Sequence, residues 1–127
     1  PLFAGESREA TLISVLDRTC TGMGGRLLRQ RLLRPSLNLA EIEAQLDGVE
    51  ALYQDTIQRS EIRKRLGSVL DVERLLARTT LGSVTPRELH GLGRSLAVIE
   101  PLWRQLEASE NRVLQSMAAA LGEGVPA

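Results

Sequence analysis

The sequence predicts an all-α protein, a multihelical array of about six to seven helices, because its apolar residues recur at steps of three and four. The chain has 127 residues, of which 43% are apolar, enough for one domain with a core of its own. No segment alternates apolar and polar residues long enough to indicate a strand. Since only 2% of the residues are aromatic, we expect leucine and valine to form the core.

We expect one helical domain over residues 10–121, with a flexible segment at 1–9 and a frayed end at 122–127. Cys20 is the only cysteine, so the chain cannot form an internal disulfide, which is typical of a reducing cytoplasm. No apolar run approaches the roughly 20 residues that span a bilayer, and residues 1–10 show no secretory signal. These observations predict a cytoplasmic protein without a membrane partner.

The clearest helix start lies at Asn38, whose side chain can cap the first turn while Glu41 reaches back to it. The apolar residues that follow recur at steps of three and four over residues 38–55, so they form one stripe along the helix. The predicted core-facing stripe consists of Leu39, Ile42, Leu46, Val49 and Tyr53.

A second strong start lies at Thr85, followed by Pro86 in the first turn and by Glu88, which completes a capping box. The stripe of this helix consists of Leu89, Leu92, Leu96, Ile99, Trp103 and Leu106. Pro101 falls inside this stripe, and the proline should either kink the helix within residues 97–101 or divide it in two. Because the stripe keeps its phase across Pro101, the sequence favours a kink.

Shorter helices are predicted over residues 11–17, 22–34, 56–66, 72–80 and 111–121, with Thr11, Thr21 and Asp71 as candidate caps. Pro35 ends the second of these helices. The segment 56–66 carries Ile62 and Leu66, and in the segment 72–80 the residues expected to face inward are Val72, Leu75 and Leu76. Gly91 and Gly93 lie inside the helix that Thr85 begins, where glycine is unfavourable, which predicts close approach of another backbone.

Residues 22–25 read Gly-Met-Gly-Gly and precede a helix that carries four arginines. A phosphate-binding loop of the Walker type would need a lysine and a hydroxyl residue after its glycines, and both are missing here. The glycines are therefore interpreted structurally, as a tight turn that lets the helix press against its neighbour. Leucines lie on nearly all sides of this helix, which predicts a central position; they are Leu27, Leu28, Leu32 and Leu33.

Charge is distributed unevenly although the formal net charge is zero. Residues 24–34 carry four arginines and no acid, whereas residues 39–55 carry five acids and no base. The two segments could face each other or be solvated, or the arginines could contact nucleic-acid phosphate. A dedicated nucleic-acid binder usually has a basic excess, which this chain lacks. The candidate phosphate contacts are Arg26, Arg29, Arg31 and Arg34.

The sequence offers no candidate catalytic, cofactor-binding or metal-ligating set. Cys20 and His90 are the only cysteine and histidine, and no pattern brings them together as a nucleophile and its base. A zinc site needs more ligands of this kind. We therefore expect Cys20 to be a partly buried residue, His90 to lie on a helix surface, and the chain by itself not to be an enzyme.

Residues 11–35, TLISVLDRTCTGMGGRLLRQRLLRP, resemble the first part of the core or lever domain (domain III) of the MutS family of DNA mismatch-recognition proteins. The matching positions here are Thr11, Leu12, Leu16, Asp17, Thr21, Gly24, Arg26, Leu28, Leu32 and Pro35. Further matches follow in order at Ile42, Leu46, Asp47, Val49, Asp71, Val72, Glu73, Arg74, Leu75, Leu76, Arg78, Gly82, Pro86, Arg87, Glu88 and Leu89.

The resemblance implies a division of labour within a longer protein. Mismatch reading would lie in an N-terminal domain, and ATP with magnesium would bind a C-terminal ATPase. The lever would transmit conformational change between the ATPase and a DNA clamp inserted into it. The partners implied are the other domains and, through them, mismatched duplex DNA. The chain would be an isolated lever fragment ending before the clamp, with Gly22, Gly24, Gly25 and Pro101 as candidate flexing points.

Such a fragment should expose an apolar groove, and large apolar patches tend to find partners, so we expect a homodimer. Two alternatives remain open at this stage. One is a stand-alone helical adaptor or oligomerisation module that binds partner helices through its leucine stripes. The other is a helical DNA-binding module that places residues 22–34 in a major groove.

Overall fold

The computed structural model describes residues 11–122, and these residues form eight α-helices without a strand, which confirms the all-α class. The helices are α1 (Leu12–Leu16), α2 (Gly22–Leu33), α3 (Leu39–Gln54), α4 (Thr56–Leu66), α5 (Val72–Thr80), α6 (Pro86–Leu96), α7 (Ile99–Glu107) and α8 (Arg112–Gly122). The expectations for residues 1–9 and 123–127 lie outside the described residues, and residue 122 is the last of α8.

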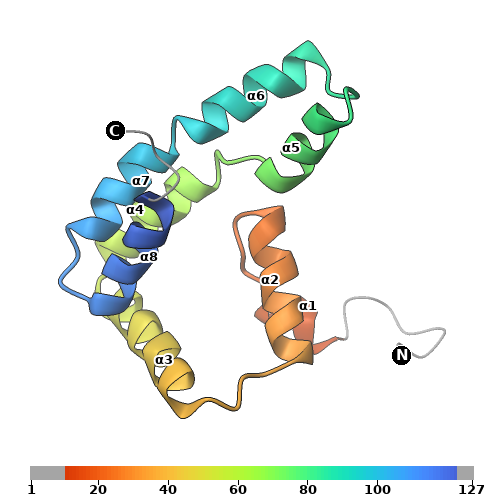
Figure 1. Cartoon of the computed structure of the whole chain (residues 1–127). Helices are drawn as coiled ribbons and strands as arrows, with labels where there is room; N and C mark the ends of the chain where they lie inside the picture. Colours follow the sequence, from red (N-terminus) through yellow and green to blue (C-terminus); the bar gives the residue numbers. More distant parts are fainter. Residues whose placement is uncertain (1–10, 123–127) are drawn as a thin grey trace.

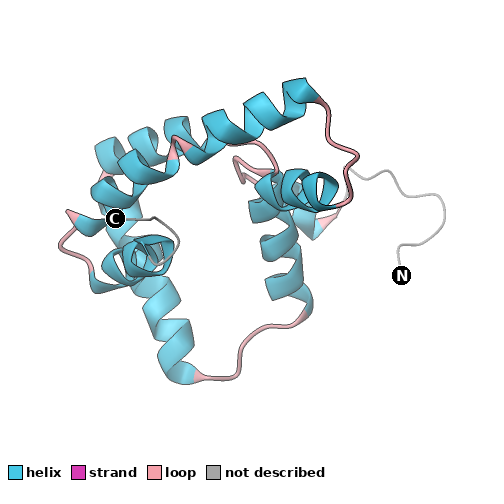
Figure 2. Cartoon of the chain, turned by 45° about the horizontal axis from the view of Figure 1, so that its top comes forward, coloured by secondary structure: helices cyan, strands magenta, loops and turns pink. Residues whose placement is uncertain are grey.

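The helices follow one another around an open ring (Figure 1). α4, α7 and α8 pack together on one side, α5 and α6 form the arm above them, and α1 and α2 stand on the opposite side. A second view shows the same arrangement, in which α2 and α3 lie on either side of the opening and are joined by a short loop (Figure 2). The α1–α2 segment is therefore set apart from most of the other helices.

The hydrophobic core lies where α4, α7 and α8 meet. Its buried members are Ile62, Leu102, Leu106, Leu114 and Ala118, against which Ala51, Leu52, Leu66, Trp103 and Leu121 pack partly buried. α4 thus contributes Ile62 and Leu66 to this core. Burial of these side chains is the main force holding this side of the ring together, since apolar burial is the dominant favourable contribution to folding.

The expected helix starts are confirmed at Thr11, Thr21, Asn38 and Asp71, whose side chains all accept backbone N–H groups of the following turn. Thr85 and Glu88 form a full capping box with Pro86 in the first turn. Every one of these caps satisfies a backbone donor that the helix itself leaves free.

One detail of the third helix start differs from expectation. Glu41 was expected to reach back to Asn38, but its carboxylate instead accepts the Ser36 hydroxyl at 2.6 Å. The Ser36 oxygen in turn accepts the Asn38 backbone N–H at 3.2 Å. The box is therefore closed through a serine two residues before the cap.

The favoured kink at Pro101 is wrong, because the sixth predicted helix is divided into two helices, α6 and α7. The break falls at Ala97 and Val98, which form a turn between them. Pro101 lies in the first turn of α7, where the N–H that proline lacks has no acceptor within the helix. Dividing the helix before Pro101 therefore avoids the lost hydrogen bond that a continuous helix would suffer.

The apolar stripe of α3 was predicted to face the core, and this prediction is also wrong. All five of its residues are exposed, among them Leu46 at 61% and Tyr53 at 76%. α3 packs against its neighbours through a different face, on which Gly48 is buried and Ala51 and Leu52 are partly buried. A Cβ atom on Gly48 would lie 3.2 Å from Val113 Cγ1 of α8, so glycine permits this close approach.

The central position predicted for the arginine-bearing helix is wrong too. α2 has no buried residue, and Leu33 is 82% exposed. Three further inward expectations fail, because Leu76 of α5 and Leu89 and Leu96 of α6 are exposed. Leucine content alone could not fix burial here, since exposed leucines are common wherever no other element lies above them.

The close approach of another backbone predicted for the two glycines of α6 is wrong for both. A Cβ atom on Gly91 would lie 2.7 Å from Leu70 Cδ1, whereas a Cβ on Gly93 would meet nothing within 4 Å. Gly91 thus makes room for a side chain of the α4–α5 loop. The buried hydroxyl of Ser95 ties the same loop to α6, since it accepts the Leu70 backbone N–H at 3.0 Å and donates to Gly91 O at 2.9 Å.

Candidate functional site at the α2–α5 joint

The glycine-rich segment forms the first turn of α2 and not a separate turn before it. Thr21 caps the helix by accepting the Gly24 backbone N–H at 3.0 Å. Among the described residues, the one glycine with a positive φ is Gly82, so residues 22–25 need no left-handed conformation. Gly22 instead permits a close approach, because a Cβ atom there would lie 3.1 Å from Asp71 Oδ2.

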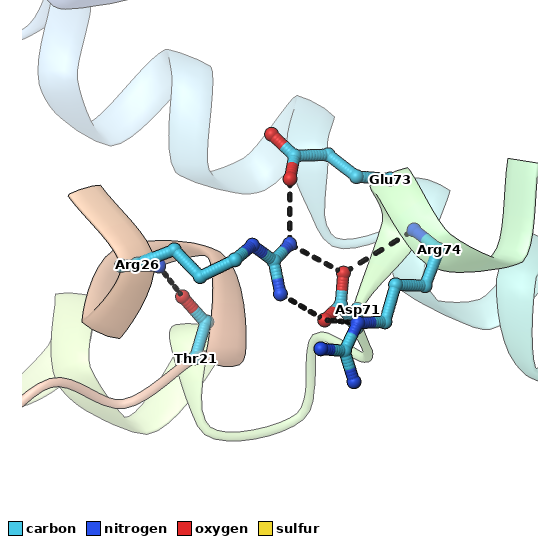
Figure 3. A network of polar contacts seen from close by, with 6 residues as sticks. Thr21, Arg26, Asp71, Glu73 and Arg74 are labelled. Carbon is cyan, nitrogen blue, oxygen red and sulfur yellow. Dashed lines mark hydrogen bonds and ion pairs between the residues drawn. The ribbon is translucent and has the colours of Figure 1, made fainter. Parts of the chain in front are cut away.

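Arg26 joins α2 to the start of α5 (Figure 3). Its Nη1 and Nη2 atoms donate to Asp71 Oδ2 and Oδ1 at 2.6 and 2.8 Å, and Nη2 also donates to Glu73 Oε2 at 2.5 Å. Paired parallel hydrogen bonds between a guanidinium and a carboxylate are among the stronger polar contacts in proteins, and they fix relative orientation. We call this set (Gly22, Arg26, Asp71 and Glu73) the joint.

Asp71 serves two helices at once. Besides holding Arg26, its Oδ1 atom accepts the Arg74 backbone N–H at 3.3 Å and thereby caps α5. The hydrogen bonds from Arg26 are the main reason that the pKa of Asp71 is lowered to about 2. The same contacts raise the pKa of Arg26 further above its ordinary value. Asp71 and Arg26 are therefore both charged at neutral pH.

A second polar contact attaches the α1–α2 segment to the remaining helices. Arg63 of α4 donates through Nη1 to the backbone oxygen of Arg18, in the loop between α1 and α2, at 2.9 Å. α2 has no fully buried residue, although Met23 and Leu28 are half-buried, so these arginine contacts matter for its attachment. A charged connection of this kind is directional and can be exchanged for water more readily than a packed core.

The four candidate phosphate contacts do not behave alike. Arg26 is engaged by the carboxylates of Asp71 and Glu73, which lie at the start of α5 and not on the acidic helix α3. Arg29, Arg31 and Arg34 are exposed. Hydrogen bonds from Thr19 lower the pKa of Asp17, and the charge of Arg29 adds to this effect. Phosphate binding by the three exposed arginines stays a prediction.

Among the candidate flexing points, the three glycines all lie within one helical turn, and Pro101 lies in the first turn of α7. The break between α6 and α7 lies before Pro101, at Ala97 and Val98. Sequence reasoning missed the joint itself, although its members Arg26, Asp71 and Glu73 are among the positions on which the family resemblance rests. It also missed Ser95, since a serine inside a helix gives no signal of burial.

Cys20 is half-buried and His90 is exposed, as expected. Within residues 11–122, no three histidine, cysteine or acidic side chains are grouped closely enough to hold a metal ion. No helix in that same range has both the length and the apolar character needed to cross a bilayer. The joint is thus the best-defined polar arrangement in the described part of the chain.

Comparison with known proteins accounts for this architecture. A family model described as MutS domain III matches residues 2–124. The chain belongs to the MutS domain III family. It is 52% identical to the DNA mismatch repair protein MutS of Solibacter usitatus, over 97% of this chain and 15% of that protein. The MutS proteins of Desulfitobacterium hafniense and Pelotomaculum thermopropionicum are 39% and 45% identical over 92% and 79% of the chain.

This MutS domain III chain spans about one-seventh of the length of the first two of these curated relatives, 15% and 14% respectively. Domain III membership confirms the resemblance seen in residues 11–35 and 71–89. It also places both sides of the joint, the start of α2 and the start of α5, within the matched range 2–124.

The charged state of the joint predicts an acid-sensitive stability. Because the fold lowers the pKa of Asp71 from 3.8 to about 2, the ionised carboxylate stabilises the fold at pH values above about 4. This contribution should be lost progressively as the pH falls from about 4 through 2. Thermal melts from pH 7 to 2 should show it, and Asp71→Asn, which can still cap α5, should show a shallower acid dependence. Equal slopes for both proteins would contradict this.

Proposed function

We propose that this chain is the lever of a MutS-type mismatch-recognition ATPase and transmits conformational change between the ATPase and the parts that hold DNA. The observation that carries the proposal is the joint. It attaches α1–α2 to the helical array through Arg26, Asp71 and Glu73, while α2 has no buried residue. A lever needs two bodies whose relative orientation can shift between defined states, and a polar attachment between two helical bodies is suited to this.

Exposed apolar side chains on the arm support the same proposal. Leu76, Leu81, Leu89 and Leu96 of α5, α6 and the turn between them are all exposed. In a longer protein these side chains offer a surface on which neighbouring domains can pack. ATP and magnesium would bind outside this chain, mismatched duplex DNA would be reached through other domains, and the site of action would be the cytoplasm. On this proposal the chain itself carries out no catalysis.

We further propose that the chain, as a separate molecule, forms a homodimer. Its exposed large apolar residues include four with exposures above 75%, namely Leu33, Leu37, Tyr53 and Leu81. Association with a partner would remove such side chains from water, which is favourable.

The lever proposal is tested in the full-length protein that contains this domain. Gly24→Ala stiffens the first turn of α2, where the added Cβ would lie 3.1 Å from Thr21 Oγ1. We expect the ratio of DNA-stimulated to basal ATP turnover to change by about threefold or more, within the range of ordinary allosteric coupling. Pro101→Ala should also change the ratio, since it removes a conformational restriction near the α6–α7 break.

Gly93→Ala is the matched control, because it also replaces a helical glycine but meets nothing within 4 Å. Its turnover ratio should equal that of the unaltered protein. Melting curves establish that every variant is folded. A folded Gly24→Ala and a folded Pro101→Ala protein that both keep the original ratio would refute the lever proposal.

A further inference from the structure

The exposed face of α3 is apolar and bordered by acids. Leu46, Val49 and Tyr53 are 61%, 65% and 76% exposed, and they lie on the side of the helix away from the buried Gly48. Glu43, Asp47 and Glu50 run beside them at spacings of four and three residues, so they line one edge of the face, and all three are exposed. A partner for this face needs an apolar side chain flanked by positive charge.

The exposed face of α2 has this complementary character. A shallow depression along the helix is lined by Arg26, Arg29, Gln30, Leu33 and Arg34. Leu33 is 82% exposed, and the exposed arginines Arg29 and Arg34 flank it. The helix thus offers an apolar centre between two cations.

These two faces do not neutralise each other within one chain. The ion pairs of Arg26 reach Asp71 and Glu73 at the start of α5, and both views show α2 and α3 on opposite sides of the opening (Figures 1 and 2). The basic segment 24–34 and the acidic segment 39–55 therefore keep their opposite charges exposed. In a molecule of zero formal net charge, a second copy supplies the matching surface.

We propose that two copies of the chain form a twofold-symmetric dimer in which α2 of each copy lies on the exposed α3 face of the other. This inference rests on the proposed self-association and specifies its surfaces. Because of the symmetry, the α2–α3 contact occurs twice: α2 of the first copy lies on α3 of the second, and α2 of the second lies on α3 of the first, as an isologous dimer requires. Pairing of α3 with α3 would instead oppose two acidic edges, and like charges across an interface are strongly unfavourable.

Charge reversal tests this pairing with an outcome that a general loss of stability cannot imitate. The first variant carries Arg29→Glu and Arg34→Glu, which replace both cations beside Leu33 by acids while the edge of α3 stays acidic. The second carries Glu43→Lys and Glu50→Lys, which leave Asp47 as the one acid among the three on that edge of α3 while α2 stays basic. Each variant alone should dimerise about tenfold or more weakly than the unaltered chain, as measured by sedimentation velocity at several concentrations. All the altered side chains are exposed, and circular dichroism checks the fold.

An equimolar mixture of the two variants should restore a dimer, because each then meets an oppositely charged helix in the other. The chain with all four substitutions should dimerise with itself again. As a control, Arg87→Glu with Arg94→Glu reverses two exposed arginines of α6 and should leave the dimer intact. High salt should weaken the dimer of the unaltered chain, since it screens exposed charges.

The possible failures are distinct. An unaltered chain that stays monomeric at millimolar concentration would overturn both the self-association and this pairing. A dimer that withstands both charge reversals, or variants that do not associate on mixing, would overturn the α2–α3 pairing alone. Neither result would bear on the lever proposal, which is measured in the full-length protein.

Discussion

Replacing Leu114 by alanine is expected to lower the free energy of unfolding by about 2–5 kcal/mol, the largest effect of any single substitution considered for this chain. The Leu114 side chain is only 1% exposed and belongs to the core formed by α4, α7 and α8. Its truncation removes buried apolar surface and leaves a cavity that close-packed neighbours can only partly fill. Because small domains have stabilities of about 5–15 kcal/mol, a loss of this size could unfold a large fraction of the molecules.

Urea unfolding followed by Trp103 fluorescence would measure this effect, since Trp103 packs against the core. Met117→Ala is the matched control on α8, because the Met117 side chain is 47% exposed and its loss should cost about 1 kcal/mol or less. Equal midpoints for the two variants would show that Leu114 does not anchor the core.

Replacing Arg26 by alanine is expected to release the α1–α2 segment while the core stays folded. The substitution removes both hydrogen bonds to Asp71 and the contact with Glu73, and it leaves Asp71 with the longer ion pair to Arg74 at 3.5 Å. Since α2 buries no side chain of its own, we expect amide hydrogen exchange in residues 12–33 to accelerate by about tenfold or more. Exchange in α7 and α8 should be unchanged.

Hydrogen exchange with mass spectrometry resolves the two regions by peptide. Arg29→Ala is the matched control, because it removes an exposed arginine from the same helix and should leave exchange near that of the unaltered chain. Arg26→Lys should recover little of the protection, since a lysine ammonium cannot make the paired contact of a guanidinium. Uniform acceleration across the whole chain would contradict the idea of a separate segment held by the joint.

The helices and their starts could be predicted from the sequence because their determinants are local. Thr85, Pro86 and Glu88 form the expected capping box, and Asp71 caps α5 as expected. A cap depends on residues within one turn, so its signal is complete in a short stretch of sequence. The division between α6 and α7 depends both on Pro101 and on packing. Pro101 is visible in the sequence, but the packing is not.

Burial could not be predicted in the same way. The regular stripe of α3 suggested a core face, yet Leu46 and Val49 are exposed and Gly48 is buried. Periodicity shows that a helix has an apolar side, but it does not show whether the chain supplies a partner for that side. Gly48 allows α3 to pack closely against Val113 of α8, which is 65 positions away in the sequence.

The joint illustrates the same limit for the candidate site. The arginines of residues 24–34 stand out in the sequence, but their acidic partners could equally have come from residues 39–55. The structure pairs Arg26 with Asp71 and Glu73, because Gly22 leaves room for the Asp71 carboxylate beside α2. Long-range pairing of this kind is decided by the path of the chain, and no local pattern encodes it.

By itself, the sequence determined that this protein is all-α, where its helices begin, and that it resembles MutS domain III, since caps, helical periodicity and ordered motifs are properties of neighbouring residues. Only the tertiary structure decided which apolar faces are covered, where the sixth predicted helix divides, and that Arg26 holds the start of α5. These features depend on which distant segments meet in space, and the free energy of those contacts is absent from any single stretch of sequence.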